Sequence, residues 1–196
     1  AEGVTSTGHV GGLCAQLGGV VEGVKNFAKI EVTVASTALS GIGGISGMTE
    51  MASTIKECEN YGSIELGTGS TTGGEFYVGG IVAYVNNAEA VIEKCVNNAA
   101  ITIPFANTKA SCFGGIAGRA NLGAQIIECQ NNAPISIADP STATAGTFLM
   151  IAGIAGSLYT GASVYRSINK ADITSNRLQV SRIGGIVGTL NSGGVV

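Results

Sequence analysis

The sequence predicts an all-β parallel β-helix (a β-solenoid) with about 35 residues and three short strands in each coil. Two phrases that recur in alternation predict this fold. Six copies of apolar-Gly-Gly-(Ile/Leu) begin at Val10, Ile42, Val78, Phe113, Ile151 (with Ala152 for the first glycine) and Ile183. Five copies of Asn-x-(Ala/Gly)-x-Ile begin at Asn26, Asn60, Asn97, Asn131 and Asn169. Self-similarity at a period of about 20 to 50 residues is typical of solenoids and arrays.

The composition is that of an ordered and largely buried chain. Of its 196 residues, 45% are hydrophobic and 12% are charged, whereas charged residues make up about 25% of a typical soluble domain. Because a repeat array grows by adding units, we expect residues 1–196 to form one solenoid domain of five complete coils and a partial sixth. The units start near residues 10, 42, 78, 113, 151 and 183. The sixth glycine phrase has no asparagine phrase after it, so we also expect a fragment of a longer array.

Three strands are expected in each unit. The first continues from the glycine phrase, as in residues 78–85. The second is the short apolar stretch before the asparagine, in residues 55–58, 92–95, 126–129 and 164–167. The third follows the asparagine phrase, where Asn97, Ala99 and Ile101 alternate with Asn98 and Ala100. This two-residue alternation predicts one buried and one exposed face.

Stacking turns equivalent positions of the units into columns. Asparagine tolerates the left-handed backbone of a corner, and stacked amides form hydrogen bonds, so a structural ladder is predicted at Asn26, Asn60, Asn97, Asn131 and Asn169. A second, interior column of small side chains is predicted at Cys58, Cys95 and Cys129, with Ser167 in the fourth copy. The residues just before these, Glu57, Lys94, Glu128 and Arg166, alternate in charge, so neighbours in that column attract one another.

A stripe of small residues lies on the other face of the glycine-phrase strand. It consists of Cys14, Ser46, Val82, Ala117, Ala155 and Val187. Two interpretations are open. Either the variable loops fold over this stripe, or it is a docking face for another chain or another part of the same protein.

The two phrases together resemble the GLUG-motif repeats of bacterial surface and secreted proteins, which include IgA-cleaving metallopeptidases. The clearest copies run from Phe113-Gly-Gly-Ile-Ala-Gly to Ile135 and from Val78 to Ile103. The first copy is looser, with Leu13 for Ile and Val24 at the cysteine position. The resemblance implies a non-catalytic stalk or adhesive array, and it carries over no catalytic residues, because no His-Glu-x-x-His motif is present.

Catalytic and cofactor chemistry is not expected. Only Asp139 and Asp172 supply aspartates, the glutamates fall in different columns, and the lone His9 precedes the first repeat, where an exposed position is expected. The five cysteines form no zinc pattern, and the calcium-binding nonapeptide of other solenoids is absent. We therefore predict no enzyme activity, no cofactor and no metal. The net charge of −3 has no basic run, so nucleic acid is not expected as a partner, and no apolar stretch is long enough for membrane insertion.

The leading hypothesis is a structural and adhesive repeat domain of a secreted or cell-surface protein. Its rigid coil would present the variable loops 67–77, 104–112 and 138–150 to a host or matrix protein or a glycan, or the chain would assemble with itself end to end or laterally. One alternative is a carbohydrate-active β-helix enzyme. The others are a filament-forming subunit and an ice-binding solenoid, the last suggested by the outward column Glu31, Glu65, Thr102, Ser136 and Thr174.

Overall fold

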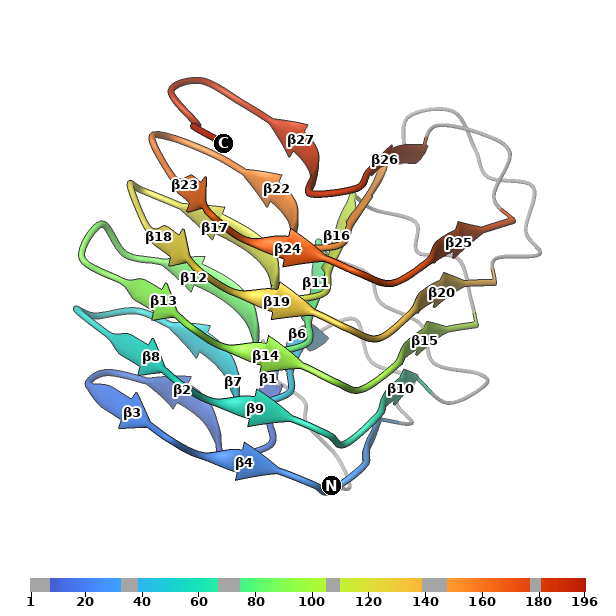
Figure 1. The fold of residues 1–196 in the computed structure, drawn as a ribbon, viewed down its shortest axis with the longest axis horizontal. Coiled ribbons are helices and arrows are strands. Elements are labelled where there is room, and N and C mark those ends of the chain that lie inside the picture. Colours follow the sequence, from blue (N-terminus) through green and yellow to red (C-terminus); the bar gives the residue numbers. More distant parts are fainter. Residues whose placement is uncertain (1–7, 33–38, 67–74, 105–109, 139–147, 177–180) are drawn as a thin grey trace.

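The computed structural model describes residues 8–32, 39–66, 75–104, 110–138, 148–176 and 181–196. These residues form strands and turns, and the coils stack in chain order from the N-terminal to the C-terminal end (Figure 1). The predicted parallel β-solenoid with a period of about 35 residues is therefore confirmed. No helix long and apolar enough to cross a membrane occurs in the described part of the chain.

Two six-stranded parallel sheets contain the glycine phrases. Sheet A consists of β1 (Gly8–Gly11), β6 (Leu39–Gly43), β11 (Phe76–Gly79), β16 (Ser111–Gly114), β21 (Leu149–Ala152) and β26 (Ser181–Gly184). Sheet B consists of β2 (Cys14–Leu17), β7 (Ser46–Thr49), β12 (Val82–Asn86), β17 (Ala117–Asn121), β22 (Ala155–Leu158) and β27 (Val187–Leu190). The glycine phrase itself forms the corner between the two sheets.

Three five-stranded parallel sheets complete the coil. Sheet C consists of β3 (Val20–Glu22), β8 (Thr54–Lys56), β13 (Val91–Glu93), β18 (Gln125–Ile127) and β23 (Ser163–Tyr165). Sheet D consists of β4 (Lys25–Asn26), β9 (Glu59–Asn60), β14 (Val96–Asn97), β19 (Gln130–Asn131) and β24 (Ile168–Asn169). Sheet E consists of β5 (Ile30–Val32), β10 (Ile64–Leu66), β15 (Ile101–Ile103), β20 (Ile135–Ile137) and β25 (Ile173–Ser175).

Each complete coil thus has five strands where the sequence predicted three. The glycine corner divides the first predicted strand between sheets A and B, as at Gly79 and Val82. A second bend follows the asparagine and divides the third predicted strand between sheets D and E. The alternation of apolar residues continues across these bends, so the sequence pattern alone did not reveal them.

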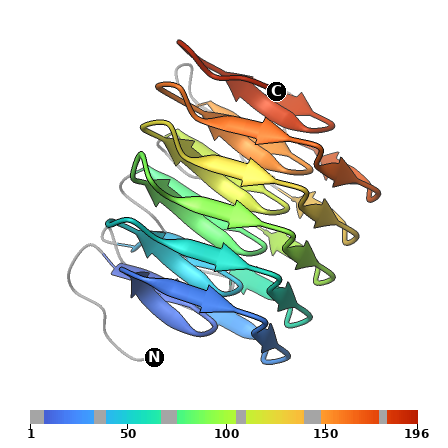
Figure 2. The same ribbon diagram turned by 60° about the vertical axis from the view of Figure 1, so that its left-hand side comes forward.

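Pairing between coils keeps equivalent residues side by side. Val78 pairs with Ile42 in the coil before it and with Phe113 in the coil after it. Asn97 pairs with Asn60 and Asn131 in the same way. The columns expected from the repeat are therefore real neighbours in space, and the ribbons run parallel along the stack in the turned view (Figure 2).

Among the described residues, a small buried cluster of Tyr77, Ala83, Cys112 and Met150 is separate from two large hydrophobic cores. One large core lies between sheets B and C and is built on columns such as Ile45, Ile81, Ile116 and Ile154. The other large core lies between sheets A and E and is built on columns such as Ile42, Val78, Phe113 and Ile151. Burial of these columns is the main favourable free-energy contribution to folding, at about 25 cal/mol per Å² of apolar surface.

Variation in length is concentrated in one connection of the coil. The A–B and C–D connections have two residues in every copy, and the D–E connection always has three. The E–A connections, in contrast, range from five residues (176–180) to eleven (138–148). The strands that precede them, β10, β15, β20 and β25, lie along one edge of the stack (Figure 1). The predicted loops 67–77, 104–112 and 138–150 overlap these connections, but each extends two residues too far, because β11, β16 and β21 already begin at Phe76, Ser111 and Leu149. Residues 67–74, 105–109 and 139–147 lie outside the described part.

Candidate functional site

The five repeated asparagines form a continuous ladder of amide hydrogen bonds along the stack. Each Nδ2 donates to the Oδ1 of the next coil, from Asn26 to Asn60 (2.9 Å), to Asn97 (3.2 Å), to Asn131 (2.8 Å) and to Asn169 (2.9 Å). The three central side chains are fully buried. Most of them also bond their own backbone two residues on, as Asn97 does with the carbonyl (3.0 Å) and the N–H (3.3 Å) of Ala99. The ladder therefore satisfies the polar groups at the bend between sheets D and E.

The glycine phrase packs directly against this ladder. A Cβ atom on Gly80 would lie 2.3 Å from Cγ of Asn97, and one on Gly115 would lie 2.3 Å from Cγ of Asn131. The carbonyl oxygen of the equivalent glycine in the next coil is closer still, at 2.1 and 2.2 Å. The second glycine of the phrase is therefore required both by the next coil's backbone and by the asparagine of the other phrase. The two phrases recur together because they are in contact between the two cores, where the glycine corner packs against the asparagine ladder.

The asparagines are not the left-handed residues of the coil, which corrects one reason given for their recurrence. The left-handed conformation instead occurs in B–C connections, at Leu122 (φ 57°) and Thr160 (φ 44°), and regularly at the C–D corner, at Glu57 (φ 51°), Lys94 (φ 52°), Glu128 (φ 53°) and Arg166 (φ 48°). We call the four residues at the C–D corner the charged corner row. The bend at the asparagine is held by side-chain hydrogen bonds, so it needs no positive φ.

The charged corner row combines backbone strain with exposed charge. The equivalent residue of the first coil is Gly23 (φ 67°), which adopts this conformation without strain. Each non-glycine residue costs roughly 1 kcal/mol there. The predicted attraction between neighbours of the row is seen for one pair, in which Arg166 Nη1 lies 3.4 Å from Glu128 Oε1. Lys94 pairs instead with Glu93 (3.4 Å) and Glu57 with Lys56 (3.8 Å), and neither partner belongs to the row. An exposed ion pair contributes about 0 to 1 kcal/mol, so these contacts do not offset the strain of four such residues.

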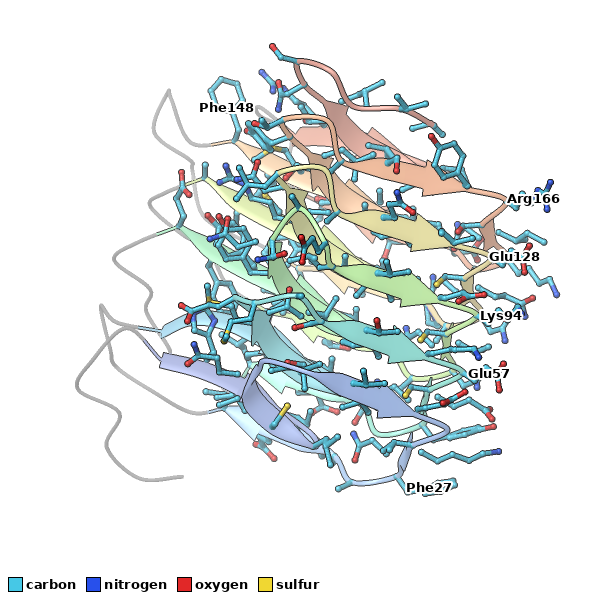
Figure 3. The ribbon with its side chains drawn as sticks, turned by 90° about the vertical axis from the view of Figure 1, so that its left-hand side faces the viewer. Phe27, Glu57, Lys94, Glu128, Phe148 and Arg166 are labelled. Carbon is cyan, nitrogen blue, oxygen red and sulfur yellow. The ribbon has the colours of Figure 1, made fainter. Side chains whose placement is uncertain are left out.

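Figure 3 places the charged corner row along a single edge of the stack, on the other side from Phe148. Phe148 borders one of the variable E–A connections. The side chains of the row project away from the coil (Figure 3), and that of Arg166 is 82% exposed. The molecule therefore has two different edges, one with variable connections and one with regularly spaced charges.

The predicted cysteine column lies inside the core between sheets B and C. Cys58, Cys95 and Cys129 are buried, and each thiol approaches the carbonyl of the last residue of its sheet C strand, as Cys95 Sγ does at 3.3 Å from Glu93. The Ser167 hydroxyl donates to the Tyr165 carbonyl at 3.0 Å in the same way. The Cys129 thiol and burial raise the pKa of Cys95 to about 12. The Cys95 thiol is therefore protonated at neutral pH, and the thiol–carbonyl contacts of the column lie at the C–D corner.

The prediction that the stripe from Cys14 to Val187 forms an outer docking face is wrong. Ser46, Val82, Ala117 and Ala155 are fully buried, and the last three belong to the core between sheets B and C. The end members Cys14 and Val187 are only partly buried. The reason is the glycine corner, which interrupts the two-residue alternation so that Ile81 and Val82 both enter this core.

A cluster on the outside of sheets A and B was not anticipated, and we call it the tyrosine–arginine cluster. It comprises Tyr77, Tyr84, Arg119 and Tyr159, with Glu75 at its rim. The guanidinium carbon of Arg119 lies 4.1 Å from the centre of the Tyr159 ring, and Nη1 donates to the Tyr77 hydroxyl at 3.1 Å. The sequence contained one indication of this cluster, because Tyr84 and Arg119 occupy the same position of successive repeats.

The tyrosine–arginine cluster connects three successive coils and covers the joint between sheets A and B. A Cβ atom on Gly118 would lie 2.8 Å from the backbone nitrogen of Val78, so the two sheets approach closely beneath the cluster. Cys112 is buried there beside Ser157 (3.2 Å), and burial raises the pKa of its thiol to about 12. The cluster is therefore a closed packing unit rather than an open site.

The remaining predicted residues occupy scattered positions. In the outward column of sheet E, Glu31 and Glu65 pair with Lys29 at 3.1 and 2.8 Å, so two of the five members are committed to ion pairs. His9 lies in β1 and is partly buried, not exposed as expected. Burial lowers its pKa, and Glu50 opposes that shift.

No group of three or more His, Cys, Asp or Glu side chains that could hold a metal ion occurs among the described residues. The side-chain arrangements that stand out among the described residues are the amide ladder, the charged corner row and the tyrosine–arginine cluster. Comparison with known proteins adds no identity, because no protein-family model, no curated protein and no solved structure matches the chain.

Proposed function

We propose that this chain is a non-catalytic structural and adhesive repeat domain of a secreted or cell-surface protein. Its coil is a rigid scaffold, and its E–A connections bind a host or matrix protein or a glycan. The observation that carries the proposal is the contrast between connections. Three of the five connection types have one fixed length, whereas the E–A connection varies from five to eleven residues. Variable loops on a rigid frame are a common arrangement for binding.

The interior of the coil supports the scaffold role. Both cores are closed, and the ladder between them has buried amide hydrogen bonds that fix the register of each coil. The resemblance to GLUG-motif repeats agrees with a stalk or adhesive array. The thiols of the cysteine column are buried, and the raised pKa of Cys95 disfavours a thiolate at that position at neutral pH.

The test exchanges connections while the coil is kept. Residues 138–148 are replaced by the sequence of residues 176–180, and residues 67–75 are replaced in the same way in a second variant. The far-ultraviolet circular dichroism spectrum and the melting temperature should change little, because strands β20 and β21 remain paired with their neighbours. Binding to a glycan array or to immobilised collagen and fibronectin should be reduced in at least one variant.

A matched control is Asn132→Ala, which alters an exposed residue of a D–E connection and leaves the E–A connections unchanged. It should bind like the unaltered protein. Binding that survives removal of both long connections would contradict the proposal. Release of reducing ends from polysaccharides incubated with the protein would favour the carbohydrate-active alternative instead.

A further inference from the structure

The charged corner row keeps four charged side chains at a backbone position that suits glycine. The first coil has Gly23 at this position, whereas the next four have Glu57, Lys94, Glu128 and Arg166, all with φ near 50°. The row lies along one edge of the stack (Figure 3), and its side chains are 38% to 82% exposed. The backbone alone gives no reason for charged residues there. Within the chain these side chains make exposed ion pairs, as Glu57 does with Lys56 (3.8 Å) and Glu128 with Arg166 (3.4 Å), and such pairs contribute too little to explain the row.

A second copy of the row that runs in the opposite direction has the opposite charge at every position. The row is negative, positive, negative, positive from coil two to coil five. Two copies aligned antiparallel bring Glu57 opposite Arg166 and Lys94 opposite Glu128, and by symmetry all four positions then face an opposite charge. Two copies aligned parallel in register bring four pairs of like charges together. A two-fold axis, the commonest symmetry of homodimers, produces the antiparallel arrangement.

We propose that the charged corner row is the interface of a homodimer in which two copies meet edge to edge and antiparallel. The two-fold axis passes between the coil of Lys94 and the coil of Glu128. Both variable edges then face outward, because Phe148 lies on the other side of the stack from the row (Figure 3).

Residues beside the row also meet in this arrangement. Ile127 and Val96, both partly exposed, then face Glu93 and Gln130 of the partner. Farther out, Tyr165 (44% exposed) and Ile168 (50%) belong to the fifth coil, which faces the second coil of the other copy. The ring of Tyr165 then faces Lys56 of the partner, a cation–π combination. An edge of this width makes a small interface, so the dimer is weak and sensitive to salt.

Sedimentation equilibrium of the full chain from micromolar to millimolar concentration tests the proposal. At low salt the protein should show a monomer–dimer equilibrium that shifts to monomer in 1 M NaCl. Lys94→Glu should raise the dissociation constant at least about tenfold, because it replaces two attractive pairs by two repulsive ones. Glu128→Lys should have the same effect. A mixture of these two single variants should dimerise, because every facing pair is then opposite in charge.

Two double variants of identical composition separate this proposal from a purely intramolecular role. Exchanging Lys94 and Glu128 (Lys94→Glu with Glu128→Lys) keeps antiparallel complementarity but places like charges next to each other within one chain. Exchanging Glu57 and Lys94 (Glu57→Lys with Lys94→Glu) makes every facing pair repulsive. The first should dimerise like the unaltered protein, and the second should be monomeric.

The outcomes that overturn the proposal are equally specific. The unaltered protein could remain monomeric up to millimolar concentration, or the two double variants could dimerise equally well. Circular dichroism of every variant establishes that the coil is folded, so a lost dimer is not mistaken for a lost fold. The proposed dimer does not involve the E–A connections. Variants with exchanged connections should therefore still dimerise.

Discussion

At the scale of single residues, buried hydrogen bonds decide which repeated positions tolerate change. Asn97 bonds Asn60 and Asn131 as well as the backbone of Ala99, and it is fully buried. Its neighbour Asn98 accepts one exposed hydrogen bond, from Asn132. The two residues are adjacent and chemically identical, so they form a matched pair.

We expect Asn97→Ala to lower the free energy of unfolding by about 2 to 4 kcal/mol, because it leaves buried amide groups of the adjacent rungs unpaired. Asn98→Ala should change it by less than about 0.5 kcal/mol. Urea denaturation followed by circular dichroism measures both. Equal effects would show that the ladder has no special energetic role.

One buried polar residue departs from the pattern of its column. Thr49 is fully buried among the inward residues of sheet B, between Leu17 and Val85. Its hydroxyl has no hydrogen-bond partner within the described chain. The hydroxyl of the nearby Ser46, in contrast, donates to the Met48 carbonyl at 3.0 Å.

Thr49→Val should therefore stabilise the protein by about 1 kcal/mol, because it replaces an unpaired hydroxyl by a methyl group of similar size. Ser46→Ala should not stabilise it, since its hydroxyl is bonded. Melting temperatures of the two variants provide the comparison. A lower melting temperature for Thr49→Val would indicate that the hydroxyl has a partner such as water.

At the scale of elements, the corner between sheets A and B depends on the absence of one side chain. The second glycine of the phrase has no space for a Cβ atom at Gly80, which lies against both the ladder and the carbonyl of Gly115. At Gly185, the same position of the last copy, no atom lies within 4 Å of an added Cβ. The first glycine is less strictly required, since Ala152 replaces it in the fifth copy.

Gly80→Ala should destabilise the protein by roughly 3 kcal/mol or more, because the added methyl group displaces backbone and ladder atoms. Gly185→Ala should be tolerated within about 0.5 kcal/mol, since nothing occupies the space. Chemical denaturation of both variants gives the result. Similar losses would mean that backbone conformation, rather than the ladder, selects glycine at this position.

At the scale of the whole molecule, the stack separates a constant frame from two different edges. Each coil contacts its neighbours through the same registers, so stability is approximately a sum of coil and interface contributions. This makes the E–A connections replaceable without loss of the frame. The charged corner row, on the other edge, is equally regular and is available for contact with a second copy.

Much of this organisation was determined by the sequence itself. The period, the parallel stacking and the columns of asparagine, cysteine and alternating charge follow from the repeated phrases, because identical units bury their apolar faces only by stacking in register. The stripe from Cys14 to Val187 shows the limit of the same reasoning. Its alternation predicted an outer face, although its central members are buried.

Only the tertiary structure decided where the chain turns and which side chains meet across sheets. The five-strand coil, the contact between the glycine phrase and the asparagines, and the grouping of Tyr77, Tyr84, Arg119 and Tyr159 all depend on corner angles. Residue alternation records which face of a strand is buried. It does not record the backbone angle at a corner, and those angles determine whether a side chain points into a core, against another sheet or into solvent.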